Sequence, residues 1–520
     1  MYKFCPIKKL IDSMISKCLP TTKGKIMGVK SLPQPHSVKL NFIMNAILKM
    51  SAFIFPLITF PYVSRIFGAA GNGKVSFAVS VIGYFSMLAQ LGIPTYGVKV
   101  CAAYRNNERK LNQTVQELLI INSITVLVSY VALFICMMMI PRLQTDRTLM
   151  LIISSSILLN AIGMDWLFEA LEQFSYITIR NLGFKILSIL LMFAFVHNPE
   201  DYVIYGAIGI VGTCGSNICN LIYARRFLDR RPIGNYNLKQ HIKPILSFFM
   251  LSASISVYAN MDSVMLGFLS SDAQVGYYAA ATKMKSILVS SITALGGVLL
   301  PRMSNYIAQG KTNEFYEMIK KSVNFTLIAS FPITIYFSFM ADSTIQILAG
   351  DGYLPAVIPM KIISLTVVLI GFSNIIGMQV FVPTNREKYT IKSTFAGALA
   401  NLIINAACIP TLGASGAAIG TVVAEATVLF VQIVYVRREL PFMVKGIQIR
   451  KIAIANVAAA IVLVLLKHKY ATINSFLLMV ITSVMFFASY ILILIFLKEK
   501  FIYCYYQTYS KKMLKMIGRK

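Results

Sequence analysis

The sequence contains little charge. Asp, Glu, Lys and Arg make up only 13% of its 520 residues, whereas 57% are hydrophobic. A soluble chain carries about 25% charged residues, so a string of cytosolic domains is excluded. The hydrophobic residues gather in repeated runs of about 20, and each run is long enough to cross a ~30 Å hydrocarbon core as a helix. The composition therefore predicts an all-α, polytopic membrane protein.

Histidine and cysteine are also scarce, and neither forms a recognisable site. The four histidines are isolated from one another, and the eight cysteines include no CxxC pair. These patterns argue against a metal site and against a disulfide framework. We therefore expect no metal and no cofactor. No nucleophile–base arrangement is visible either, so we do not expect an enzyme.

The sequence predicts fourteen transmembrane helices. Each is an apolar run with charged or turn-forming residues at both ends. The predicted spans are 42–62, 75–96, 116–139, 148–170, 178–196, 202–224, 244–268, 276–300, 323–345, 358–382, 391–410, 414–436, 450–466 and 475–497. The loops that alternate with them on the outer side are all short. With no external domain available, we expect the function to be carried out within the membrane.

Basic residues outnumber acidic ones by 49 to 20. In a soluble chain such an excess would suggest a nucleic-acid partner, but here the position of the charges matters more. With the N-terminus placed in the cytoplasm, the cytoplasmic segments hold 37 Lys and Arg, against 6 in the outward loops and 6 inside spans. Because cytoplasmic loops collect basic residues, this bias predicts a cytoplasmic-membrane protein with both termini inside. It leaves little reason to expect nucleic-acid binding.

Two sequence matches, each offset by six predicted helices, indicate an internal repeat. Ser64–Gly68 is similar to Ser263–Gly267, and Ile208–Val211 is similar to Ile419–Val422. An even offset gives both halves the same orientation, as in transporters whose repeats are related by an axis along the membrane normal. Such halves rock against each other around a central site, so the repeat predicts a transporter.

The repeat and the charge pattern together predict the domain organisation. A basic cytoplasmic tail (1–40) precedes a first six-helix lobe with its cytoplasmic linker (41–243). A second six-helix lobe (244–449), two additional helices (450–497) and a cytoplasmic tail (498–520) follow.

Several motifs of this chain resemble those of Wzx-type polysaccharide flippases. They are Asp165–Glu169 with Tyr176–Asn181, Asp262–Gly267 with Val275–Tyr278, Leu300–Ser304, and Gly413–Glu425. The resemblance covers about residues 41–497 and implies the multidrug/oligosaccharidyl-lipid/polysaccharide exporter superfamily. It implies that the chain moves undecaprenyl-pyrophosphate-linked oligosaccharide repeat units from the inner to the outer leaflet for surface polysaccharide biosynthesis. Membrane lipids are expected partners, and the resemblance also allows polysaccharide polymerase or assembly proteins.

Lysines inside the spans are candidate substrate-binding residues, because a charge at a helix centre costs at least ~2.5–3.5 kcal/mol unless a partner or water surrounds it. Lys49 lies about two helical turns into the first span, which contains no acid, and Asn45 lies one turn before it. We predict that Lys49 contacts the anionic headgroup of the substrate. Lys185, Lys283 and Lys285 are predicted to line the same cationic cavity.

Three acids inside the spans are candidates for charge pairing or ion coupling. Asp165 and Lys185 are equidistant from the centre of their helical hairpin, as are Asp262 and Lys283, so each pair is expected to meet at one depth. Two interpretations are open. Either each pair is a structural salt bridge in which the charges neutralise each other, or the cations line a cavity that binds an anionic headgroup. Glu425, near the middle of its span, either takes a proton during the cycle or pairs with a lysine.

Three further charged residues are left out of the candidate site. Glu169 and Arg180 also face each other across their hairpin, but they lie near the cytoplasmic boundary, where interfacial water solvates charge. Lys361 lies near an outer helix end, from which a lysine side chain reaches the interface.

Three other functions were weighed. A lipid-linked peptidoglycan precursor flippase of the same fold fits the charge pattern equally well. A drug/cation antiporter of that fold fits less well, because the first span carries Lys49 and no acid. A membrane polymerase or ligase would need a long outward catalytic loop, which the predicted topology lacks.

Overall fold

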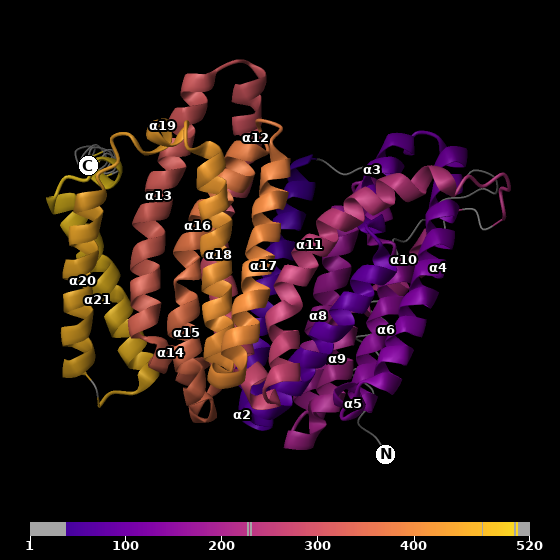
Figure 1. Cartoon of the computed structure of the whole chain (residues 1–520), viewed down its shortest axis with the longest axis horizontal. Helices are drawn as coiled ribbons and strands as arrows, with labels where there is room; N and C mark the ends of the chain where they lie inside the picture. Colours follow the sequence, from indigo (N-terminus) through magenta and orange to yellow (C-terminus); the bar gives the residue numbers. More distant parts are fainter. Residues whose placement is uncertain (1–37, 226–227, 229–230, 471, 504–505, 508–520) are drawn as a thin grey trace, which may run out of the picture. The chain divides into compact units, whose positions relative to one another are not determined.

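The computed structural model describes residues 38–225, 228, 231–470, 472–503 and 506–507 (Figure 1). This described part is helical and contains no β-strand, as predicted. It forms two compact units, one within residues 1–67 and 74–264 and the other within 68–73 and 265–520. Most of the two predicted tails, 1–40 and 498–520, lies outside the described residues.

The first unit contains most of α2 and the following elements through most of α11. These are α2 (Val38–Gln90), α3 (Ile93–Tyr104), α4 (Glu108–Met139), α5 (Pro141–Gln144), α6 (Arg147–Gly163), α7 (Asp165–Ala170), α8 (Phe174–Phe195), η1 (Pro199–Asp201), α9 (Tyr202–Cys214), α10 (Asn217–Ala224) and α11 (Lys239–Leu269). The division between the units falls inside α11, after Val264, whereas the predicted lobe boundary lay at 243/244. The beginning of α11 packs against α3, where Tyr96 Oη lies 2.8 Å from His241 Nδ1.

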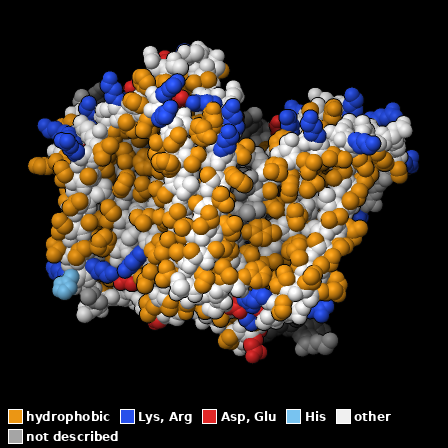
Figure 2. Space-filling model, viewed as in Figure 1, with side chains coloured by type: hydrophobic (Ala, Val, Ile, Leu, Met, Phe, Trp, Pro, Cys, Tyr) orange, Lys and Arg blue, Asp and Glu red, His pale blue; other side chains and the backbone are white. Residues whose placement is uncertain are grey.

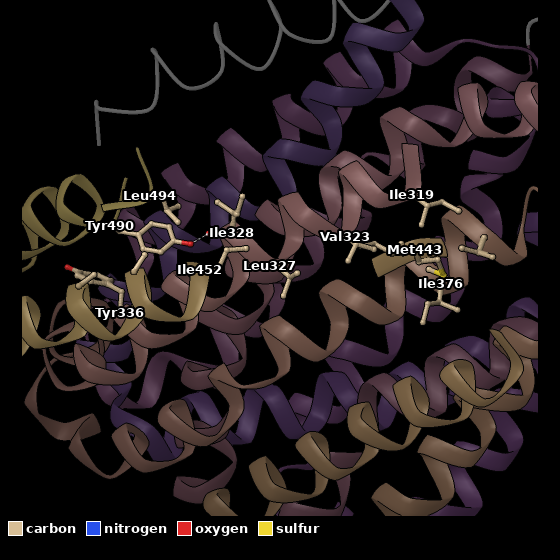
Figure 3. Packing of buried hydrophobic residues seen from close by; sticks show 14 of the residues in the cluster. Ile319, Val323, Leu327, Ile328, Tyr336, Ile376, Met443, Ile452, Tyr490 and Leu494 are labelled. Carbon is tan, nitrogen blue, oxygen red and sulfur yellow. Dashed lines mark hydrogen bonds between the residues drawn. The ribbon is translucent and has the colours of Figure 1, made fainter. Parts of the chain in front are cut away.

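The second unit contains the remaining helices and the two additional C-terminal ones. Its elements are α12 (Asp272–Ala308), α13 (Thr312–Phe339), α14 (Ala341–Ala349), η2 (Asp351–Ala356), α15 (Val357–Ser364), α16 (Thr366–Asn374), η3 (Ile375–Phe381), α17 (Glu387–Leu412), α18 (Ala414–Val436), α19 (Leu440–Val444), α20 (Ile449–Lys469) and α21 (Ser475–Phe496). A buried hydrophobic cluster joins α13 to α20 and α21 (Figure 3). Tyr490 of α21 donates a 3.0 Å hydrogen bond to the Ile328 carbonyl of α13, so the additional helices belong to this core.

Twelve segments of the described part are long and apolar enough to cross a membrane. The predicted number of fourteen is therefore not confirmed. The predicted spans 42–62 and 75–96 both fall in α2, which consists of two helices joined at a kink at Gly68 (φ 62°, ψ −169°) and is counted within one of the twelve segments. That backbone conformation favours glycine, which lacks a Cβ. The predicted span 244–268 falls in α11, which is not among the twelve.

Apolar side chains cover the outward faces of the helices in both units, while Lys and Arg gather near helix ends (Figure 2). On α4, for example, Leu127 is 66% exposed and Val128 is 62% exposed. A membrane supplies the apolar environment that such faces need, which agrees with the predicted polytopic membrane protein.

Helices α2 and α8 run parallel and in register within the first unit. Three side-chain hydrogen bonds join them at one constant offset of 134 residues: Thr178 to the Met44 carbonyl (3.0 Å), Lys185 to Ser51 (2.8 Å) and Tyr62 to the Val196 carbonyl (2.8 Å). The bonds extend along ~27 Å of helix at 1.5 Å per residue. This pairing fixes which residues of the two helices share a depth.

The predicted span 148–170 is not one continuous helix. It breaks at Met164, whose left-handed backbone (φ 47°, ψ 36°) ends α6 and starts α7. Next to the break, a Cβ on Gly163 would lie 2.5 Å from Asn217 Cγ, so glycine allows α10 to approach closely. Chain breaks within a membrane are tolerated where protein groups satisfy the freed backbone atoms.

Candidate functional site

The break at Met164 is surrounded by polar side chains from three helices. Asp165, the first residue of α7, accepts hydrogen bonds from Arg180 Nη2 of α8 and from Asn220 Nδ2 of α10, both at 2.7 Å. Asn220 also donates to the Gly163 carbonyl at 2.5 Å. One amide thus satisfies both a backbone group at the end of α6 and the carboxylate that begins α7.

Arg180 is the cation at the centre of this cluster. Its side chain is 0% exposed, whereas that of its partner Asp165 is 46% exposed. Its Nε and Nη1 atoms have no hydrogen-bond partner among the residues that the structure describes. The ring of Tyr176 lies 5.6 Å from the guanidinium carbon, a cation–π distance. The ion pair therefore holds a buried guanidinium against a carboxylate that still faces outward.

The predicted pairing of Asp165 with Lys185 is wrong. Asp165 pairs with Arg180 instead, and Lys185 bonds Ser51. The equal-depth argument assumed two unbroken helices, and the turn at Met164 changes the direction in which Asp165 points. Arg180, which we had left at the interface as a solvated charge, is in fact fully buried.

Neutral polar residues extend the cluster beyond the ion pair. Ser216 donates to Asn181 Oδ1 at 2.6 Å, and Asn217 donates to Asn160 Oδ1 at 3.2 Å. The sequence analysis missed these residues because it searched the spans only for charge. The available signal was the recurrence of asparagine in the apolar spans that contain α6, α8 and α10.

Lys185 is a half-buried ammonium in α8, ~16 Å of helical rise after Phe174. Its Nζ donates a 2.8 Å hydrogen bond to Ser51 Oγ and lies 5.5 Å from the centre of the Phe55 ring. The Ser51 hydroxyl donates its own hydrogen bond to the Leu48 carbonyl at 2.6 Å, so its oxygen can accept the hydrogen bond from Lys185. No carboxylate contacts Lys185 within the described ranges, and an ammonium carries three donors.

The other predicted residues of this unit lie on the helix that Lys185 contacts. Asn45 is half-buried in α2, and Lys49 belongs to the same helix, although its side chain lies outside the described residues. The bond to Ser51 therefore brings Lys185 alongside the stretch of α2 that carries both predicted residues. Their role in binding stays a prediction.

In the second unit, Lys283 and Lys285 are half-buried on α12, and Glu425 is buried on α18. Asp262 is buried on α11 and belongs to the first unit, so its predicted pairing with Lys283 stays a prediction. The proton-carrying or pairing role of Glu425 also stays a prediction.

Helices α12, α17 and α18 meet through polar and small residues near Glu425. Tyr278 Oη lies 2.8 Å from Thr421 Oγ1, which joins α12 to α18 one turn before Glu425. Asn405 donates to Asn401 within α17 at 3.1 Å, and Gly420 of α18 lies against this pair so closely that a Cβ would overlap Asn405. Buried polar contacts therefore lie within about one turn of Glu425 on α18.

The chain resembles known membrane proteins over most of its length. The family model described as polysaccharide biosynthesis protein matches residues 38–307. A protein of Escherichia coli K12, whose name gives it a proposed role as an O-antigen transporter, is 23% identical over 403 residues, which cover 77% of this chain and 97% of that protein.

Two solved structures show the same fold. The lipid II flippase MurJ, in an inward closed conformation, matches with a TM-score of 0.71 and 14% identity, over 88% of this chain and 98% of its own. An inward-facing multidrug resistance transporter of the MATE family, within the MOP superfamily, matches with a TM-score of 0.57 and 12% identity, over 78% of this chain and 99% of its own. The superfamily fold predicted from the motifs is therefore confirmed.

Proposed function

This chain belongs to the polysaccharide biosynthesis protein family, and we propose that it is a flippase for undecaprenyl-pyrophosphate-linked oligosaccharide repeat units. The substrate moves from the inner to the outer leaflet of the cytoplasmic membrane, with both termini of the chain in the cytoplasm. The E. coli relative named for O-antigen transport supports a saccharide cargo. The membrane-embedded cationic groups support an anionic lipid carrier.

The observation that carries the proposal is the environment of Lys185. Its ammonium is half-buried in a membrane helix, and among the described residues its polar and ring contacts are the Ser51 hydroxyl and the Phe55 ring. A charge so placed is unfavourable unless water or a ligand solvates it. Phosphate oxygens would accept hydrogen bonds from the remaining N–H donors and neutralise the charge of the ammonium, whereas a neutral or cationic ligand would not neutralise it.

The proposed binding site extends from Lys185 along α2 to Asn45 and Lys49. The constant register of α2 and α8 keeps these residues on neighbouring turns of two parallel helices. In the second unit, Lys283 and Lys285 are proposed to contact the same anionic group during the cycle. The two units alternate access to the two leaflets while the prenyl tail remains in lipid.

A drug/cation antiporter is the less suitable function for this site. Such transport needs a carboxylate that is available to a cation, but the first span carries Lys49 and no acid. A lipid-linked peptidoglycan precursor would suit the lysines as well as a repeat-unit lipid does, because both present phosphate groups. The two lipids are best distinguished by mass spectrometry of the lipid that co-purifies with the protein.

The experiment compares two lysine variants in proteoliposomes that contain a fluorescent prenyl-pyrophosphate oligosaccharide. Lys185→Ala should lower the translocation rate at least tenfold with normal insertion, and Lys185→Arg should retain part of it. Lys361→Ala is the matched control, because Lys361 is an exposed lysine on α15. Equal rates for Lys185→Ala and the unmodified protein would refute the proposed role of Lys185.

A further inference from the structure

Two cavities lie along one side of α4 in the first unit. The larger, of about 380 Å³, extends from Asn112 past Leu119 to Met164 and Leu221. The smaller, of about 300 Å³, also includes Leu119 and extends to Tyr130. Because they share a wall residue, we treat them together as the α4 groove. Its volume falls in the range of known small-molecule sites.

The groove is mostly apolar along its whole length, and its charged lining residue, Arg225, lies at one end. Asn112, Gln116, Tyr236 and Arg225 line the end next to the start of α4. From Leu119 onward its walls are mostly aliphatic, with Val126 among them. A ligand that fits this lining has an anionic head next to Arg225 and one apolar chain.

The groove is longer than one leaflet of a bilayer by ~5–7 Å. From Asn112 to Tyr130 the helix rises ~27 Å. One leaflet with its headgroup region measures ~20–22 Å, half of a whole bilayer. The predicted span on α4 is 116–139, so Asn112 lies at the cytoplasmic interface and Tyr130 lies near the bilayer centre.

The polar end of the groove carries positive charge. Arg225 is exposed and forms no ion pair with any residue in the described part of the chain. It begins the connection 225–243, which holds six Lys and Arg but one acid. Basic residues at the cytoplasmic surface attract anionic lipid headgroups.

We propose that the α4 groove binds one acyl chain of an anionic phospholipid from the cytoplasmic leaflet, with its phosphate at Arg225. The prenyl tail of the proposed substrate suits the groove less well, because an undecaprenyl chain is more than twice as long as an acyl chain. The bound chain also contacts Met164, the residue at which α6 breaks before Asp165. Occupancy of the groove therefore supports the break that positions the ion pair.

The test uses the full chain in vesicles of phosphatidylcholine with one-fifth phosphatidylglycerol, with a photoreactive group on the acyl chain of either lipid. Crosslinks from phosphatidylglycerol should concentrate in peptides of α4 and α10. Ser123→Trp, which places a bulky ring at an exposed wall position, should reduce them at least fivefold. Val128→Trp, on an exposed face of the same helix and outside the groove, should leave them unchanged.

A charge variant tests the headgroup separately. Arg225→Gln should abolish the preference for phosphatidylglycerol over phosphatidylcholine, whereas Arg109→Gln, an exposed arginine of α4 that does not line the groove, should preserve it. Equal crosslinking of both lipids in the unmodified protein would overturn the proposal. So would equal effects of the two tryptophans, or displacement of phosphatidylglycerol by undecaprenyl phosphate at equal concentration. None of these outcomes depends on the transported cargo.

Discussion

The ion pair between Asp165 and Arg180 predicts how substitutions of either residue change the free energy of unfolding. Asp165→Asn removes the charge that neutralises a fully buried guanidinium. Removing one partner of a buried pair costs about 3–5 kcal/mol. The half-exposed carboxylate and the retained amide contact reduce this figure, so we expect a loss of about 2–3 kcal/mol in the free energy of unfolding.

Arg180→Met should be milder. It replaces the buried cation by an apolar side chain, and Asp165 keeps its bond to Asn220 and its partial exposure. We expect a loss of about 1 kcal/mol, and a double variant that recovers part of the Asp165→Asn defect, with a coupling energy of about 1–3 kcal/mol. Lys185→Gln, combined with Asp165→Asn, should show additive losses, because the two side chains have different partners.

The assay is unfolding of the purified protein in mixed micelles by increasing SDS, followed by tryptophan fluorescence. Trp166 is the only tryptophan of the chain and lies directly after Asp165. It is buried against Gly97 of α3, where its ring would lie 2.7 Å from an added Cβ. Its emission therefore reports on the region of the break. Coupling of Asp165 to Lys185, with none to Arg180, would refute the reasoning.

Other features of the fold give further expected outcomes. Gly276→Ala should sharply lower the yield of folded protein, because its Cβ would overlap a backbone carbonyl of α2, while Gly297→Ala on the same helix, in open space, should not. His241→Ala should cost about 1–3 kcal/mol by leaving a buried glutamate of α4 without its 2.7 Å contact, and limited proteolysis should then cut residues 231–238 faster. Cysteine at Asp272 should react with impermeant maleimide from outside intact cells, whereas cysteine at Asn235 should not; the reverse labelling would contradict the topology.

Much of the fold could be predicted from apolar run length alone. The spans 450–466 and 475–497 correspond closely to α20 and α21, because each is bounded by charged or turn-forming residues. The interruption of the first long helical element also agrees with the sequence prediction. The kink at Gly68 lies in the polar connection between the predicted spans 42–62 and 75–96, where Ser64, Arg65 and Lys74 interrupt the apolar runs.

The candidate site could be predicted less well, because partner choice depends on local geometry. The search for intramembrane charge identified Lys185 and Asp165, and both lie in polar environments. Their partners could not be derived from equal depth, since the left-handed backbone at Met164 interrupts the helix that the depth comparison assumed to be continuous.

The neutral residues around the break show why charge alone is an incomplete guide in a membrane protein. A break in a membrane helix frees backbone groups that lipid cannot satisfy. Here Asn220 supplies the missing donor to the Gly163 carbonyl and also binds Asp165. An amide can do both because it carries two donors, whereas a serine hydroxyl carries one. If this account is right, Asn220→Ser should keep one of the two contacts and Asn220→Leu neither. In SDS unfolding, Asn220→Ser should then be less stable than the unmodified protein, and Asn220→Leu less stable still. Equal stability of Asn220→Leu and the unmodified protein would show that the break does not depend on Asn220.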